Sequence, residues 1–375
     1  MDSRTRNELD ELLSPYFIPD FWNRLQGRLI YRAPEHAVPP EQLEALLQTL
    51  LARGYIPHVD RTDGEIVLYV AGKIPRQKPR YWLHALLFVA TIFTTMAAGA
   101  SLVGKDILLG LGNIWYGWQY SMAVLLILTS HEMGHFIAAR LHKVDVTLPY
   151  YIPLYLPALN FGTMGAFIKI RSPIPNRRAL MDIGVAGPIA GFIVSLGMLI
   201  YGYATLPDLD GIIAYVEKIH PWNPQGVTVN VVLGKSLLFA FFNDVIGGGR
   251  LPMNEVYHFP FIFAGWIGLL VTAINLIPIG QLDGGHILYA LIGNKSRRAG
   301  ITAFVILLVL NIFLWYRYAT PAWMLWIIFI LVLIGFRHPP TLNDTVALSP
   351  LQRVLGWTSM VIFILCFIPL PIYVQ

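Results

Sequence analysis

His131-Glu132-Met133-Gly134-His135 is the stretch from which the fold and the chemistry of the chain can be worked out, because it follows a long apolar run. The 24 residues from Ile107 to Ser130 carry no charge, which is enough for a helix to cross a bilayer core of about 30 Å. A glutamate and two histidines at the end of such a run are costly in lipid unless they meet a partner, a water-filled cavity or a bound ion. The stretch therefore predicts a functional site at membrane depth.

In a helix, positions four apart share one face, so His131 and His135 can direct their imidazoles at the same point. Glu132 is turned by about 100° from His131, close to that point without having to bind an ion. This is the H-E-x-x-H pattern, in which two neutral imidazoles bind Zn²⁺ and the carboxylate acts as a general base. We therefore predict that His131 and His135 are metal ligands and that Glu132 is catalytic.

The composition is that of a membrane protein. Of 375 residues, 55% are hydrophobic and only 13% are charged, and the mean hydropathy is +0.57. The net charge of +5 needs no nucleic-acid partner, because basic residues flank the apolar runs, where they set topology and meet anionic lipid. The single cysteine, Cys366, excludes an internal disulfide and a multi-thiolate metal site. The first residues lack an apolar signal core, so we expect no cleavable signal.

The apolar runs predict an α-helical polytopic membrane protein with about six to seven transmembrane helices and a re-entrant or β-hairpin element. The expected spans are about 82–102, 115–143, 180–204, 259–279, 301–316, 318–336 and 354–373. In the third span, Gly187 and Gly191 have the small-xxx-small spacing that favours close helix packing over substrate contact.

The charges around the first span predict the orientation in the membrane. Four basic residues in the segment 73–80 place the N-terminus on the cytosolic side, so the second span returns its His-Glu-His end toward the cytosol. We expect a multi-pass protein of the bacterial cytoplasmic membrane or an equivalent membrane, with the site inside the bilayer near its cytosolic face.

Residues 1–79 predict a small soluble, cytosolic α+β domain of β-α-β-β order that ends in a basic linker. Strands are expected at 27–32, 55–59 and 65–70, and a helix begins at Pro40. Leucines 43, 46, 47, 50 and 51 form the apolar stripe of that helix. Residues 80–375 are expected to form the transmembrane domain, with a catalytic core at about 115–293.

The uncharged stretch Val146 to Ile168 cannot be a regular spanning helix, because it contains Pro149, Pro153 and Pro157. We interpret it as a re-entrant element or hairpin, with residues 161–168 extended. Irregular backbone at membrane depth has to be buried in protein or to line a wet cavity.

A catalytic zinc usually has three protein ligands, so the two histidines need a third. Asp283 is the favoured candidate, because it supplies an anionic oxygen beside two glycines that allow close approach. His286, His84 and Asp182 are the alternatives. Asn275 stands two turns before Asp283, and its side chain is open to two interpretations: an interhelical hydrogen bond or a donor to an oxyanion.

His131-Glu132-Met133-Gly134-His135, taken together with the Asn275-x-x-Pro278 and Leu282-Asp283-Gly284 segments, resembles the site-2 protease family of intramembrane zinc metalloproteases. The sequence shows no visible PDZ insertion, and in this respect it resembles the branch of the family found in cyanobacteria and chloroplasts. The resemblance covers about residues 115–293.

The resemblance implies that His131, His135 and Asp283 bind Zn²⁺, that Glu132 is the base and that Asn275 assists the reaction. It also implies that the extended stretch pairs with an unwound substrate segment, through Phe161, Gly162, Thr163, Met164, Gly165 and Ala166.

These implications give a function: hydrolysis of a peptide bond within or near a transmembrane segment of a membrane-protein substrate. The expected partners are that substrate and the lipid bilayer, with no nucleic acid, and the sequence does not indicate an oligomeric state. The alternative is a transporter or channel with a His/Glu/Asp proton or metal pathway, which would be expected to show related halves. A membrane hydrolase acting on lipid or prenylated peptide is a weaker alternative.

Overall fold

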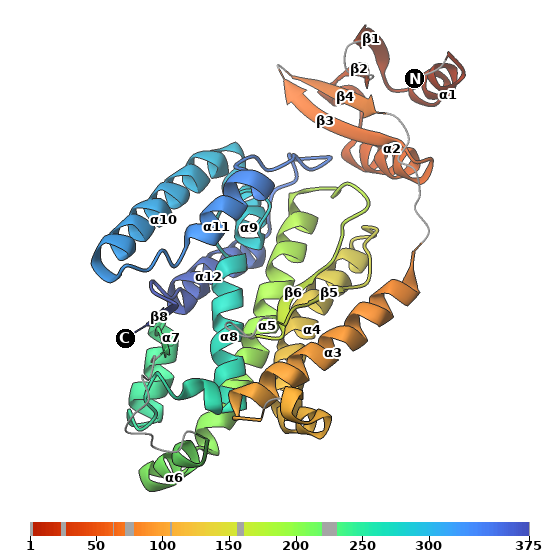
Figure 1. Ribbon diagram of the computed structural model, residues 1–375. Helices are drawn as coiled ribbons and strands as arrows, with labels where there is room; N and C mark the ends of the chain where they lie inside the picture. Colours follow the sequence, from red (N-terminus) through yellow and green to blue (C-terminus); the bar gives the residue numbers. More distant parts are fainter. Residues whose placement is uncertain are drawn as a thin grey trace.

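The computed structural model describes residues 3–23, 28–62, 64–71, 79–105, 107–155, 161–219 and 231–374. Within these ranges the protein is mostly helical, with a small sheet at its N-terminal end (Figure 1). The predicted linker at 73–80 falls largely outside the described residues, as do Gly27 and Pro157. The predicted division at residues 79 and 80 therefore stays a prediction.

Among the described residues, four helical segments are long and apolar enough to cross a membrane. They are α3 (Tyr81–Leu102), the segment Leu111–Leu141 that includes α4 (Trp118–Leu141), α5 (Arg177–Ala204), and the segment Asp283–Tyr318 formed by α9 (Asp283–Ile292) and α10 (Ser296–Tyr318). Shorter apolar helices are α7 (Leu237–Ala240) with the π turn that follows it, α8 (Pro260–Asn275), α11 (Met324–Phe329) with its π turn, and α12 (Pro350–Cys366). The helical character is as predicted, and the number of six to seven spans stays a prediction.

Helices α4, α5 and α8 form the centre of the helical part (Figure 1). α4 lies along α5, and α8 packs against both. Side chains of α8, including Trp266, Leu269 and Ala273, are fully buried in the largest hydrophobic core. Because three apolar helices enclose one another here, polar side chains that point inward from α4 are shielded from solvent.

Several predicted boundaries are wrong. Ile107 to Gly117 forms 3₁₀ turns, and α4 begins at Trp118, three residues after the expected start of the second span. α8 ends at Asn275, three residues before Pro278, which cannot supply the amide that a continuing helix needs. The expected span 318–336 is occupied by the short Met324–Ile334 helix. Between the expected spans 180–204 and 259–279 lies the amphipathic helix α6 (Leu209–Ile219), which is not among the expected elements.

The N-terminal unit, meaning the described residues from Ser3 to Ala71, has the order α-β-β-α-β-β instead of β-α-β-β. It comprises α1 (Ser3–Leu13), β1 (Ile18–Asn23), β2 (Arg28–Pro34), α2 (Pro40–Ala52), β3 (Ile56–Thr62) and β4 (Glu65–Ala71). The sheet is antiparallel in the order β1-β2-β4-β3. The predicted stripe of α2 is buried at Leu43, Leu46, Leu47 and Leu50. α1 and β1 were missed because α1 is rich in charge and β1 contains Pro19 and Asp20, which disfavour strands.

Loop residues 341–343 join this unit to the helical part. The backbone amide of Val59 in β3 donates to the Leu342 carbonyl at 2.8 Å, and His58 Nδ1 donates to the Thr341 carbonyl at 3.1 Å. On its other side the same loop donates from Leu342 to the Ile174 carbonyl, at 3.0 Å. The loop thus lies between β3 and the segment that precedes α5.

The predicted hairpin is present as β5 (Tyr150–Pro153) and β6 (Thr163–Phe167), which pair antiparallel. β5 packs against α3. The pairing continues irregularly beyond β6 through a bridge between Val146 and Ile170. The hairpin therefore runs from the middle of the helical part toward the N-terminal unit (Figure 1).

One hydrogen bond ties the unexpected helix α1 to the sheet. Tyr31 in β2 is buried and donates to Asp10 Oδ1 at 2.7 Å. Burial and the adjacent carboxylate raise the pKa of Tyr31 far above its usual range, so the phenol stays a donor at ordinary pH.

Tyr31→Phe should loosen α1, because it removes this bond and costs about 1 kcal/mol of local stability. In hydrogen exchange of the full-length protein, α1 amides should exchange roughly fivefold faster. Tyr69→Phe is the matched control, since the Tyr69 hydroxyl has no hydrogen-bond partner among the described residues. Equal exchange of α1 in the two variants would contradict this role for Tyr31.

Candidate metal centre

The C-terminal half of α4 carries the polar residues His131, Glu132 and His135 among apolar neighbours. All three are buried, with exposed fractions of 4%, 5% and 7%. The i, i+4 spacing places both imidazoles on one face, as predicted, and their Nε2 atoms are 3.1 Å apart.

Helix α5 supplies the wall behind these two imidazoles. A Cβ at position 187 would lie 2.1 Å from His135 Nε2, and one at position 191 would lie 3.1 Å from the His131 Cβ. Gly187 and Gly191 therefore let α5 approach the histidine face of α4, which agrees with the predicted packing role of this small-xxx-small pair.

A backbone carbonyl of α5 orients one of the imidazoles. His135 Nδ1 donates to the carbonyl of Ile183 at 2.7 Å. This bond fixes the proton on Nδ1, so Nε2 keeps its lone pair for a metal ion. No residue type in the sequence indicates this contact, because the acceptor is a main-chain carbonyl that only the register of α5 on α4 brings into place.

Asp283 reaches the same point from the first position of α9. The chain turns between the end of α8 and Asp283, and the turn is tight enough that a Cβ at position 284 would lie 2.1 Å from the Leu276 carbonyl oxygen. Gly284 thus allows α9 to start directly against the end of α8. This is the close approach for which the sequence analysis favoured Asp283 as the third ligand.

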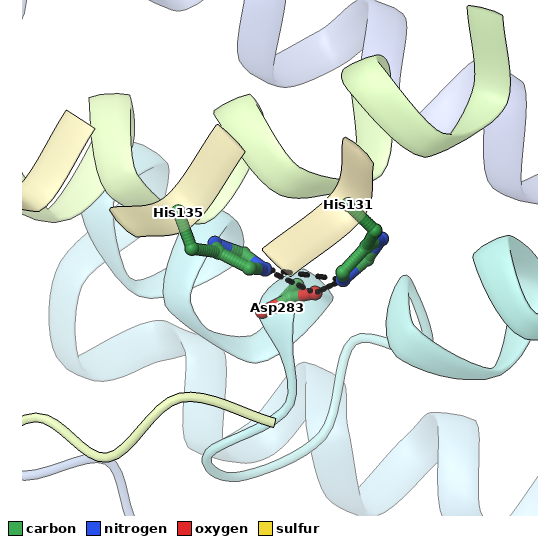
Figure 2. A group of neighbouring side chains, drawn as sticks. All are labelled: His131, His135 and Asp283. Atoms are coloured by element: carbon green, nitrogen blue, oxygen red, sulfur yellow. Dashed lines mark hydrogen bonds and ion pairs between the residues drawn. The ribbon is translucent and has the colours of Figure 1, made fainter. Parts of the chain in front are cut away.

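The three side chains converge on one point (Figure 2). Asp283 Oδ2 lies 3.3 Å from His131 Nε2 and 3.2 Å from His135 Nε2. Among the described residues, one group of three or more histidine, cysteine, aspartate or glutamate side chains has the spacing of metal ligands, and it consists of His131, His135 and Asp283.

The spacing of these donor atoms fits a tetrahedral ion. With bonds of about 2.0–2.1 Å to nitrogen and oxygen, neighbouring ligand atoms of a tetrahedron are about 3.3–3.4 Å apart. The three measured separations of 3.1, 3.2 and 3.3 Å match one face of that tetrahedron. Two imidazoles and one carboxylate also form a donor set typical of catalytic zinc, with a fourth position left for water or substrate.

The alternative third ligands lie elsewhere. His286 Nδ1 donates to His338 Nε2 at 2.5 Å, and His84 Nδ1 donates to the Pro149 carbonyl at 3.0 Å. Asp182 pairs with His142 at 2.8 Å. The structure thus favours Asp283, and it shows that His286 and His84 have other partners.

Asn275 and Glu132 both border the three-donor group. Asn275, the last residue of α8, places its side-chain Nδ2 3.2 Å from His131 Nε2. The carboxylate of Glu132 faces the backbone of Ile168, immediately after β6. One predicted catalytic residue therefore stands beside a ligand and the other beside the predicted substrate strand.

The predicted substrate residues divide into two sets. Thr163, Met164, Gly165 and Ala166 lie in β6. Phe161 and Gly162 precede the strand: the Phe161 carbonyl accepts from Tyr120 at 2.9 Å, and a Cβ at Gly162 would lie 2.5 Å from the Thr95 backbone. These two positions pack against α3 and α4, so their predicted pairing with substrate has less room than that of the strand itself.

Comparison with known proteins gives one family and several relatives. The model of "Peptidase family M50" matches residues 119–314, slightly more than half of the chain. "Probable zinc metalloprotease EGY1, chloroplastic" of Arabidopsis thaliana is 30% identical over 249 residues, which cover 66% of this chain and 42% of that protein. The protein of the same name from Oryza sativa subsp. japonica is 28% identical over 312 residues, which cover 78% of this chain and 51% of that protein. No solved structure matches.

The chain thus spans about half the length, or less, of the curated relatives that it matches. Its helices and its group of two imidazoles and one carboxylate define a mostly helical protein with helices apolar enough to cross a membrane and a buried side-chain cluster with the spacing of metal ligands. The chain belongs to peptidase family M50, the family of the site-2 proteases, and the resemblance found in the sequence is confirmed.

Gly187→Ala should abolish metal binding, because its methyl carbon would be built 2.1 Å from the ligand atom of His135. Elemental analysis of the purified full-length variant should find less than about a tenth of the wild-type metal content, since loss of one of three ligands weakens binding strongly.

Gly197→Ala is the matched control for this measurement. It makes the same change in the same helix, where a Cβ would meet nothing within 4 Å. Its metal content should equal that of the wild type, and equal loss in both variants would show that α5 is merely intolerant of alanine.

Proposed function

We propose that this protein is an intramembrane zinc metalloprotease that hydrolyses a peptide bond within or near a transmembrane segment of a membrane-protein substrate. The observation that carries the proposal is the convergence of His131, His135 and Asp283 on one buried point beside Glu132. Membership of family M50 supports it, as do the names of the plant relatives, which are described as probable zinc metalloproteases.

The three ligands would hold Zn²⁺, which when bound supplies a Lewis acid that polarises the scissile carbonyl and acidifies water. Glu132 takes the proton of the attacking water and passes it to the leaving amine. Its buried position between His131 and the backbone of Ile168 keeps bulk water from competing for that proton.

Asn275 donates from its side-chain amide to the oxygen of the carbonyl as it gains negative charge. Its position 3.2 Å from His131 Nε2 supports this role, because a group there also borders the substrate side of the ligands. The second interpretation, a hydrogen bond between helices, would require only that the side chain remain polar.

The hairpin β5–β6 presents the substrate. A transmembrane helix hides its carbonyls in its own hydrogen bonds, so the segment to be cleaved has to unwind. The β5 side of β6 is paired, and an extended substrate segment would pair with the other edge by strand addition, next to Glu132. Residues 163–166 are the part of the predicted substrate set that lies in this strand.

The membrane supplies the remaining partners and the setting. We infer six to seven spans in the bacterial cytoplasmic membrane or an equivalent membrane, with the N-terminus and the metal centre toward the cytosolic side. The basic residues Arg140, Lys143 and Arg297 support this orientation, because they flank apolar helices, at the end of α4 and the start of α10.

Glu132→Gln should abolish cleavage without loss of metal, because it keeps the shape of the side chain and removes only the base. In liposomes containing single-span substrate proteins, the rate should fall by roughly 100- to 10,000-fold, with the zinc content equal to that of the wild type. His135→Ala is the contrasting variant and should lose both. A wild-type cleavage rate in Glu132→Gln would contradict the role of Glu132 as the base. Cleavage by the wild type that is indifferent to a chelator would contradict hydrolysis that depends on a metal ion.

Asn275→Ala distinguishes the two roles of that side chain. An oxyanion donor predicts a fall in kcat of roughly 100- to 1,000-fold with little change in KM, whereas a packing role predicts a lower thermal stability and a nearly unchanged kcat. Asn275→Gln is a useful comparison, since it keeps the amide and moves it by one bond length or more. The measurement is steady-state kinetics combined with thermal unfolding of each variant.

A further inference from the structure

A cleft of about 790 Å³ separates the N-terminal unit from the helical part. Its walls come from the end of α2, the first turns of α3, the end of α4 and the segments that extend the β5–β6 hairpin. Phe136, the residue after the ligand His135, and Arg140 one turn further line the side formed by α4. The cleft therefore begins where the metal-binding part of α4 ends.

The charge of this cleft is strongly positive. Its described lining includes Arg140, Lys143, Lys169 and Arg171, and Asp145 is the one carboxylate among the lining residues that the structure describes. In the part of the chain that the structure describes, none of the four cations has a carboxylate within ion-pair distance. His142 is also a lining residue, but Asp182 already pairs with it.

The backbone presents one of these cations at a conformational cost. Lys143 has a φ of 58°, the left-handed region that side chains other than glycine and asparagine adopt with difficulty. It follows the last turn of α4, where a glycine is common. The chain thus places a lysine in the cleft at a position that would be less strained with glycine.

The cleft continues the predicted substrate strand. Beyond β6, the Thr147 amide donates to the Lys169 carbonyl at 3.0 Å, and the Arg171 amide donates to the Asp145 carbonyl at 2.8 Å. Lys169 and Arg171 are two residues apart in this extended segment, so they project on the same side. Ile168, whose backbone lies beside Glu132, immediately precedes Lys169. Lys169 and Arg171 therefore follow directly on the backbone that borders the catalytic base.

We infer that this cleft binds an acidic segment of the substrate, the part of its chain that flanks the transmembrane segment to be cleaved. The inference rests on the proposed function and deepens it by naming a substrate class. A substrate segment paired with β6 would leave the strand edge beside Lys169 and enter the cleft in extended form. Carboxylates at alternate positions of that segment would then face Lys169 and Arg171.

An anionic lipid headgroup fits the same charges less well. A phosphate needs several donors that converge on one point, whereas Lys169 and Arg171 are spaced along an extended segment by about 6.6 Å of strand rise. One wall of the cleft is also formed by the N-terminal unit, through Leu51 and Tyr55, which encloses a chain more readily than it admits the surface of a bilayer.

The first experiment measures peptide binding without catalysis. The full-length Glu132→Gln protein in uncharged detergent is titrated with short fluorescent peptides that carry glutamate, serine or lysine at alternate positions. The glutamate peptide should bind on the order of tenfold more tightly than the serine peptide, with an affinity that falls as salt is added. Equal affinity for the glutamate and serine peptides would overturn the inference.

Charge reversal locates the site. The double variant Lys169→Glu, Arg171→Glu should weaken glutamate-peptide binding on the order of tenfold and should strengthen binding of the lysine peptide. The matched control, Lys295→Glu with Arg297→Glu, makes the same change of charge at two exposed residues outside the cleft and should alter neither affinity. Loss of glutamate-peptide binding in the control as well would assign the effect to net charge and overturn the inference.

Cleavage assays separate this inference from the proposed function. Two single-span substrates with one transmembrane segment and either acidic or serine-rich flanks are incubated with the active protein. Faster cleavage of the acidic substrate supports the inference, and equal rates overturn it while the protease function stands. If neither substrate is cleaved although the protein contains its full zinc, the proposed protease function is wrong. The cleft then cannot be a binding site for a protease substrate.

Lipid binding is the remaining outcome to test. The double variant and the wild type are compared in nanodiscs with and without phosphatidylglycerol, with retained lipid measured by native mass spectrometry. The inference expects equal retention of phosphatidylglycerol by both proteins. If charge reversal removed bound lipid and left peptide affinity unchanged, the cleft would be a lipid site and the inference would be wrong.

Discussion

The close contact of α4 with α5 is the constraint on which the rest of the site depends. Two imidazoles that leave one face of a helix need space behind them, and the absence of side chains at Gly187 and Gly191 provides it. The same contact brings the Ile183 carbonyl to His135 Nδ1 and so fixes which nitrogen faces Asp283. Ligand position, ring orientation and proton location therefore follow from one helix–helix distance.

The polar groups of the centre are expensive to bury one at a time, and they are buried as a set. His131, Glu132 and His135 come from α4, and Asp283 arrives from a separate helix that starts in a tight turn after α8. An anionic carboxylate beside two imidazoles is stabilised by an ion that neutralises it, whereas any member left alone at this depth would face a large desolvation cost. This interdependence explains why such a polar cluster can exist between apolar helices.

The grouping of His131, His135 and Asp283 could be predicted from the sequence better than the boundaries of the helices and strands. His131 and His135 follow from helical spacing, and Asp283 follows from its carboxylate and adjacent glycines, because each depends on local chemistry that the sequence states directly. By contrast, α1 is rich in charge and is held by tertiary contacts: two buried leucines and the hydrogen bonds that Tyr31 and Tyr55 donate to Asp10 and Glu8. Likewise, uncharged residues 107–117 form 3₁₀ turns because of their packing on α3, which hydropathy cannot reveal.

The loop at 341–343 mechanically links two distant parts of the molecule. It holds β3 through Val59 and His58 on one side, and on the other it bridges to Asn176, whose side chain caps the start of α5. Hydrogen bonds of about 3 Å tolerate little stretching. A rigid-body tilt of the N-terminal unit would therefore break these bonds or displace the start of α5. Because α5 also shapes the histidine face, the loop couples the position of the N-terminal unit to the helix beside the metal ligands.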